Sequence, residues 1–268
     1  MVAVALIFAA CDGDSGNNSS EMEGDSSSSA GIYSSGGQGN SSPVVKSSSS
    51  SIGVSSSSVK AQSSSSSTKQ GTLIYGGQTY KTVVIGTQTW MAENLNYADS
   101  AAMPNLKGNS WCYNNSADSC AKYGRLYTWT AAMDIASSYL SASAAAVISA
   151  PQQGVCPTGW HIPTDAEWTT LETAVGGEDT AGTKLKSTSG WSSSGNGRDA
   201  YGFSALPAGY RSYDGSFFSV GDDASFWSAT EYDTDYAYSR DLDYDFANMF
   251  ADSHSKIRAF SVRCVQDF

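Results

Sequence analysis

The chain has 268 residues, and its 26 acidic side chains outnumber 15 basic ones, which gives a formal net charge of −11. Proteins that bind nucleic acid neutralise phosphates with clustered Lys and Arg, so this balance argues against a nucleic-acid partner. An acidic chain also gains nothing from anionic lipid surfaces. Solubility is the simplest explanation of the charge.

The N-terminus is an almost wholly apolar segment that ends at a cysteine. Residues 1–10 are followed by Cys11, and the two residues before it are alanines. This arrangement resembles a bacterial lipobox, which implies lipidation of Cys11 and export to the cell surface or outer membrane, with membrane contact through the lipid alone. No Lys or Arg precedes the apolar run, so a truncated ordinary signal peptide and a free cysteine stay open as alternatives. The anchor also accounts for the odd total of five cysteines.

Residues 12–71 are dominated by runs of serine. They lack the apolar side chains that would offset the entropy of ordering a chain, so we expect a disordered linker. The following residues, 72–268, contain every tryptophan of the chain. They are numerous enough for one well-buried domain, which we expect to be monomeric.

The first part of this domain predicts short strands, a closed loop and a helix. A bridge between Cys112 and Cys120 would close a small loop. Apolar side chains at helical spacing then predict a helix over 123–136. Before the loop, β-type runs broken by glycine turns predict a meander of strands at 72–75, 79–85 and 87–91.

Residues 154–168 contain the strongest local signals in the domain. Thr164 and Glu167 have the spacing of a capping box, in which each side chain bonds to the backbone of the other residue. From Trp168 onward, apolar residues recur at helical spacing until a pair of glycines. The pattern predicts a short amphipathic helix over 165–175.

The remaining residues predict ordered loops and further strands. Two helices in a strand-rich domain, with strands near both ends, indicate an α+β fold with two short helices and several short antiparallel strands. The expected loops are 184–191 and 195–202, and the expected strands are 203–211, 225–230, 237–246 and 259–265.

Six blocks, in order along the chain, resemble the Fibrobacter succinogenes major paralogous domain family over residues 72–268. The family occurs on exported, often lipid-anchored bacterial surface proteins, so the resemblance implies the same location for this chain. The blocks are 78–96, 123–129, 156–168, 203–211, 226–231 and 261–265.

The blocks at 159–168 and 263–264 are also similar, more distantly, to the C-type-lectin-like fold and to the fold of formylglycine-generating (sulfatase-modifying) enzymes. This similarity implies a compact fold whose loop-rich half presents ligand sites, although fold alone does not establish function. Those enzymes use two closely spaced cysteines late in the chain, whereas only Cys264 stands there. No catalytic residue is carried over, and we expect a protein that is not an enzyme.

A second disulfide is expected between Cys156 and Cys264, which would join the segment before the 165–175 helix to the last strand. Zinc is the alternative, but the chain lacks the usual close-spaced ligand pairs and has only two histidines, His161 and His254. Export favours disulfides. We expect His161 to be a structural hydrogen bonder.

Acidic and aromatic residues are interleaved between positions 222 and 252. Asp241, Asp243 and Asp245 alternate with apolar residues, so a strand here would have one acidic and one apolar face. A solvated outer strand is the simplest interpretation. The sharper hypothesis is that these three aspartates bind Ca²⁺, a hard cation that prefers oxygen ligands. No other cofactor is expected.

Aromatic rings beside carboxylates suit sugars, because rings stack on the apolar faces of sugars and acids accept hydrogen bonds from hydroxyl groups. Buried packing explains some of these rings equally well. We expect a non-catalytic surface lipoprotein that binds extracellular polysaccharide or glycan. An adhesion or structural protein that contacts other envelope proteins is the alternative, and an enzyme with an unrecognised site is third. The candidate ligand-binding residues are Tyr210, Tyr213, Tyr232, Tyr236, Tyr238 and Tyr244.

Overall fold

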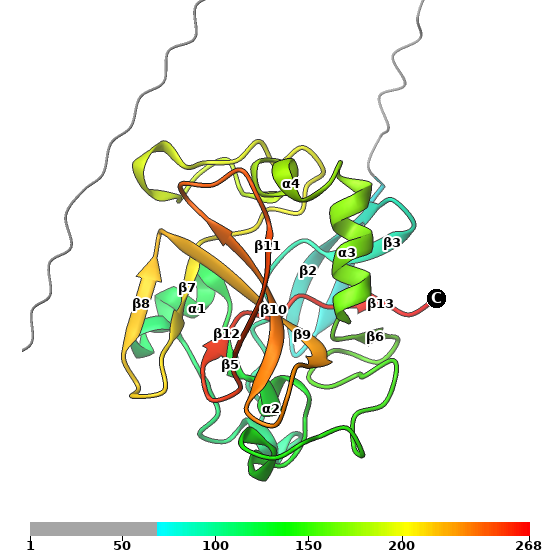
Figure 1. The fold of residues 1–268 in the computed structure, drawn as a ribbon, viewed down its shortest axis with the longest axis vertical. Coiled ribbons are helices and arrows are strands. Elements are labelled where there is room, and N and C mark those ends of the chain that lie inside the picture. Colours follow the sequence, from blue (N-terminus) through cyan, green and yellow to red (C-terminus); the bar gives the residue numbers. More distant parts are fainter. Residues whose placement is uncertain (1–68) are drawn as a thin grey trace, which may run out of the picture. The chain divides into compact units, whose positions relative to one another are not determined.

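A computed structural model describes residues 69–268 (Figure 1). The apolar segment with Cys11 and the serine-rich segment up to residue 68 lie outside the described residues. The first strand, β1 (Gln70–Tyr75), begins two residues before the predicted start of the domain at residue 72, so residues 70 and 71 belong to the domain. None of the helices between residues 69 and 268 has the length and apolar character needed to cross a bilayer.

The domain is α+β, as predicted, and its strands form two sheets. The smaller sheet has five antiparallel strands, and its C-terminal strand lies between two earlier ones, so both ends of the domain are tied into one sheet. Its strand order is β1, β2 (Gln78–Ile85), β3 (Gln88–Met91), β13 (Val265–Gln266) and β6 (Trp160–His161). The meander of β1, β2 and β3 confirms the strands predicted there.

The larger sheet holds eight strands, and its long central strands form one side of the site described below. Its pairs are antiparallel except for β7 with β9, which meet in parallel at Gly209 and Ala224. The strand order is β11 (Phe250–Ser255), β10 (Tyr236–Asp243), β9 (Asp223–Glu231), β7 (Ala208–Arg211), β12 (Ala259–Phe260), β5 (Leu126–Thr128) and β4 (Ser110–Trp111), with β8 (Phe217–Val220) paired to β7.

Between residues 69 and 268 the structure has four α-helices where two were predicted. The predicted helix over 123–136 forms only at Trp129–Ala132, because Gly124 adopts a φ of +76° and Leu126–Thr128 pair with strands β4 and β12. The predicted loop at 184–191 begins inside a helix. The helices are α1 (Ala117–Tyr123), α2 (Trp129–Ala132), α3 (Asp165–Ala174) and α4 (Glu178–Leu185), with 3-10 turns at Pro104–Leu106, Tyr113–Asn115, Ser137–Leu140 and Ser192–Ser194.

Helix α3 confirms the helix predicted at 165–175, and it contacts both sheets. Both halves of the capping box between Thr164 and Glu167 are formed. Trp168 on α3 packs against Trp90 of β3 and Phe226 of β9, with ring centroids 4.7 and 5.7 Å apart. Such fully buried aromatic pairs contribute strongly to packing, and through Trp168 helix α3 packs against one strand of each sheet.

Both expected disulfides are present in the structure. Cys112 and Cys120 close the loop that leads into α1. Cys156 and Cys264, which are 108 residues apart in sequence, join the segment before β6 to the segment before β13. The second bridge therefore connects the capped α3 region to the last strand of the domain.

Candidate functional site

The predicted alternation of acidic and apolar side chains holds along β10. Asp241 and Asp243 lie on one face of the strand, while Arg240 and Leu242 on the other face are buried. Arg240 Nη1 forms an ion pair with Asp165 at the start of α3, so the face away from Asp241 and Asp243 packs on this helix. The strand ends at Asp243, and the third predicted ligand, Asp245, lies in the turn that follows.

Strands β9, β10 and β11 bring further polar residues onto the face of Asp241. In the register of the sheet, Asp243 lies opposite Asp223 of β9, and Asp241 lies opposite Phe250 of β11. Asp252 and His254 follow Phe250 at alternate positions of β11, so they share its face. Together with neighbouring strands, these residues enclose a pocket of about 310 Å³ lined by Tyr210, Asp223, Ser225, Asp241, Leu242, Asp243, Phe246, Phe250, Asp252, His254, Arg258 and Phe260.

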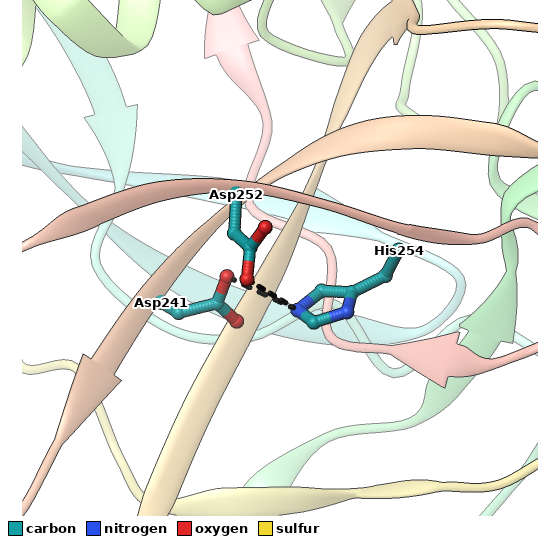
Figure 2. A group of neighbouring side chains, drawn as sticks. All are labelled: Asp241, Asp252 and His254. Carbon is teal, nitrogen blue, oxygen red and sulfur yellow. Dashed lines mark ion pairs between the residues drawn. The ribbon is translucent and has the colours of Figure 1, made fainter.

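Three side chains of this pocket point toward one another from two adjacent strands (Figure 2). His254 Nε2 is 3.5 Å from Asp241 Oδ2 and 3.7 Å from Asp252 Oδ2. Among residues 69–268, Asp241, Asp252 and His254 are the one group of three potential metal ligands whose ligand atoms all lie within 4.8 Å of one another. We call them the Asp–Asp–His cluster.

Negative charge predominates in the pocket, where four aspartates face one arginine and one histidine. Burial raises the pKa of the Asp223 carboxyl, and the charges of Asp243, Asp222 and Asp241 raise it further, while a hydrogen bond from Ser219 lowers it. Arg258 lies against the Tyr210 ring, with its guanidinium carbon 5.3 Å from the ring centroid. The site therefore offers hydrogen-bond acceptors and aromatic surface to a hydroxyl-rich or cationic ligand.

Of the predicted Ca²⁺ ligands Asp241, Asp243 and Asp245, only Asp241 belongs to the Asp–Asp–His cluster. The carboxylate of Asp243 accepts a hydrogen bond from the Asp245 backbone N–H at 2.6 Å and so caps the turn after β10. Buried Lys186 donates to the carbonyl oxygens of Asp243 and Phe246 at 2.8 and 2.9 Å. The ammonium group of Lys186 therefore already supplies a positive charge at this turn.

The six candidate tyrosines do not share one surface. Tyr210 lines the pocket. Tyr213 is 73% exposed in the turn after β7, and Tyr244 packs at the edge of the core around Trp168. The other three lie at the hairpin between β9 and β10, where the rings of Tyr232 and Tyr238 meet edge to face and Tyr236 is exposed.

Sequence reasoning missed the contribution of β11 to the site. Phe250, Asp252 and Arg258 were not among its candidates, and His254 was weighed only for a zinc site with the cysteines, although Phe250, Asp252 and His254 alternate in the way expected of one strand face. The missing information was the register of β10 against β11, which places Ser239 opposite Asp252 and Ala237 opposite His254. The connecting residues 244–249 contain no Asn-Gly or Asp-Gly pair, the sequence signal that would have indicated a hairpin and its register.

His161 belongs to a separate cluster near the C-terminus. Its Nε2 is 2.7 Å from Glu167 Oε1, and its Nδ1 is 2.6 Å from Asp267 Oδ1. Burial lowers the pKa of His161, but these two carboxylates more than compensate, and the net shift is upward. Both ring nitrogens therefore have acceptors, which is the arrangement expected of a structural hydrogen bonder.

A family model described as the Fibrobacter succinogenes major domain matches residues 83–266, a range that includes both disulfides and every residue lining the pocket. No curated protein and no solved structure matches the chain. The family match agrees with the six sequence blocks and spans more than half of the chain. The protein therefore belongs to the Fibrobacter succinogenes major domain family.

Proposed function

We propose that this protein is a non-catalytic binding protein of the bacterial cell surface, and that the pocket on β9, β10 and β11 binds a polysaccharide or glycan. The observation that carries the proposal is the pocket itself, in which aromatic rings stand beside four carboxylates on one sheet face. Sugars present both apolar ring faces and hydroxyl groups, so a site for them needs both kinds of side chain.

The geometry of the rings supports binding at an open surface. Phe246 is 51% exposed, and its ring lies 5.4 Å from that of Phe250 in an edge-to-face arrangement. The aspartates of the pocket are only partly buried, apart from exposed Asp252, so their oxygen atoms are accessible. A glycan chain lying across the β10–β11 edge would meet rings and acceptors together.

The location of the protein is part of the same proposal. A lipid on Cys11 and the serine-rich segment would present the domain outside the cell, and two disulfides suit an oxidising compartment. We also propose a distant relation to the C-type-lectin-like and sulfatase-modifying folds, supported by the C-terminal strand lying between β3 and β6. An experimental structure compared by topology with those folds tests this relation.

A hydrolase is the second candidate, because oxygen atoms of Asp241 and Asp252 lie within 4.8 Å of each other. Retaining glycosidases place two carboxyl groups about 5–5.5 Å apart. Release of reducing sugar from a bound polysaccharide, lost in Asp241→Asn, would favour this candidate over simple binding. Retention without any release favours the binding protein.

Retention on insoluble polysaccharides and a glycan array test the proposal with the purified chain. We expect retention on at least one glycan, and loss of it in Asp241→Asn and Phe250→Ala. Tyr213→Ala is the matched control, because this exposed aromatic residue lies outside the pocket. If no glycan retains the chain, or if Tyr213→Ala alone abolishes retention, the proposal is wrong. Capture of an envelope protein would then favour the adhesion alternative.

A further inference from the structure

We propose that Asp241, Asp252 and His254 form a binding site for a divalent transition-metal ion such as Zn²⁺. The site lies in the pocket proposed to bind glycan, but the inference does not depend on that function, since the metal is bound by the protein's own side chains. It also differs from the calcium site predicted from Asp241, Asp243 and Asp245 in two of its three ligands and in its metal.

The distances between the three side chains fit a shared ion better than hydrogen bonds. Separations of 3.5 and 3.7 Å from His254 Nε2 to the two carboxylates are too long for good hydrogen bonds. Two ligands at zinc's usual distances, arranged tetrahedrally, are about 3.4 Å apart. Both separations from His254 therefore have nearly the spacing that two ligands of one ion adopt, and the two carboxylate oxygens lie within 4.8 Å of each other.

Neighbouring residues hold two of the three ligands in place. Ser239 Oγ donates to Asp241 Oδ2 at 2.5 Å, which fixes the orientation of that carboxylate. The ring of Phe260 packs edge-on against the His254 imidazole, with centroids 5.0 Å apart. Because the ligands stand on paired strands, an ion would bind with little reorganisation of the backbone.

The ligand types select the class of metal. Imidazole nitrogen suits Zn²⁺, Ni²⁺ and related ions, whereas Ca²⁺ takes oxygen ligands almost exclusively. Three protein ligands in an open pocket leave a position for water or for a hydroxyl group of a bound molecule. The same pocket can therefore hold a metal and a ligand at once.

Arg258 competes with a metal ion for the His254 imidazole. Its Nη1 lies 3.3 Å from His254 Nδ1 and donates toward it, which places the imidazole proton on Nε2. A metal on Nε2 requires the proton on Nδ1, where it would face the arginine N–H groups. Metal binding must therefore displace Arg258, which supplies positive charge to this acidic pocket in the absence of an ion.

Calorimetric titration with ZnCl₂ and CaCl₂, without sugar, tests the site in the full chain carrying Cys11→Ser, which removes a competing thiol. We expect one Zn²⁺ per chain, bound more tightly than Ca²⁺. Asp252→Asn and His254→Ala should each weaken Zn²⁺ binding by at least about 10-fold. Asp243→Asn, in the same pocket but outside the cluster, should leave it nearly unchanged.

The Arg258→Gln variant distinguishes a metal site that uses the His254 imidazole from a merely acidic patch. The glutamine oxygen can accept a hydrogen bond from Nδ1–H, so Zn²⁺ affinity should rise by on the order of 10-fold. Loss of the arginine charge alone would raise the affinities for Ca²⁺ and Zn²⁺ by similar factors, whereas release of the imidazole adds a gain for Zn²⁺ only, so the Zn²⁺ affinity should rise by the larger factor.

Co²⁺ gives a second readout in the chain with native ligands. The chain has two histidines, so paramagnetic shifts of the imidazole protons are easily assigned, and we expect them on His254 and not on His161. Absence of Zn²⁺ binding, affinity unchanged in both ligand variants, a Co²⁺ shift on His161 instead, or weaker binding in Arg258→Gln would each overturn the site. None of these outcomes decides whether the pocket binds glycan without a metal, which the retention experiment tests separately.

Discussion

The ammonium nitrogen of Lys256 lies 2.6 Å from Oε1 of Glu231, and the lysine side chain is completely buried. The same nitrogen donates to the Thr234 carbonyl and lies 4.9 Å from the centre of the Trp129 ring. Glu231 also accepts from the backbone N–H of Ala144. This ion pair and the Ala144 hydrogen bond tie the end of β9 to the turn after β11 and to the loop after the 3-10 turn Ser137–Leu140.

Replacement of Lys256 by Met should destabilise the domain by about 3–5 kcal/mol, because it leaves the partly buried Glu231 carboxylate without its cation. The double change Lys256→Met with Glu231→Leu should recover much of the loss, since no unpaired charge remains. Urea denaturation measures both. A loss in the single variant below about 1 kcal/mol would show that the pair behaves like an exposed salt bridge.

The two disulfides should differ in their effect on stability because they close loops of different length. In the chain-entropy model, the Cys156–Cys264 bridge, with a sequence separation of 108, contributes about 5 kcal/mol, and the Cys112–Cys120 bridge, with a separation of 8, about 2.5 kcal/mol. We expect the pair of Cys→Ser changes at 156 and 264 to lower the urea midpoint more than the pair at 112 and 120. Equal losses would contradict the entropic account.

Local signals explain which parts of the fold could be predicted from the sequence. The 165–175 helix was predictable because Thr164 and Glu167 satisfy each other's backbone groups within four residues. The hairpins of β1, β2 and β3 follow from glycine turns between β-branched runs. The helix predicted over 123–136 is limited to Trp129–Ala132 because tertiary pairing of Leu126–Thr128 with β4 and β12 outweighs helical spacing.

The site was predictable only in its first strand. Alternation along β10 placed Asp241 and Asp243 on one face, as the structure has them. His254 and Asp252 could not be assigned, because they join Asp241 through strand register and not through spacing in the sequence. The contact of Lys186 with the turn after β10 could not be predicted either, because Lys186 stands at the end of α4, far from that turn in sequence.

Gly124→Ala should cost on the order of 1–3 kcal/mol, because this glycine has a φ of +76° and a side chain there would crowd its neighbours. A Cβ atom would lie 2.9 Å from the carbonyl oxygens of Asn94 and Leu95. Gly108→Ala is the matched control, with a φ of +72° but open space around it. Urea denaturation should show a larger loss for Gly124→Ala, and equal losses would mean that backbone strain alone sets the cost.

The His161 cluster should make stability depend on pH in a defined direction. Its carboxylate partners raise the pKa of His161 above the ordinary value of 6.5, whereas bonds from His161 and Thr164 lower the pKa of Glu167 despite its burial. A histidine whose pKa is raised on folding stabilises the protein fully below its unfolded pKa, and this contribution disappears as pH rises through the folded pKa. A carboxyl whose pKa is lowered stabilises above its unfolded pKa and loses that contribution as pH falls.

The cluster should therefore stabilise the domain most in weakly acidic solution, between the unfolded pKa values of about 4.3 for Glu and about 6.5 for His. Melting temperatures measured across a pH series test this in the native chain, in His161→Gln and in His254→Gln. We expect His161→Gln to remove part of the decline in melting temperature above neutral pH, while His254→Gln keeps it, because only His161 joins two carboxylates within hydrogen-bonding distance. Parallel curves for the native chain and His161→Gln would show that protonation of this imidazole does not stabilise the C-terminus.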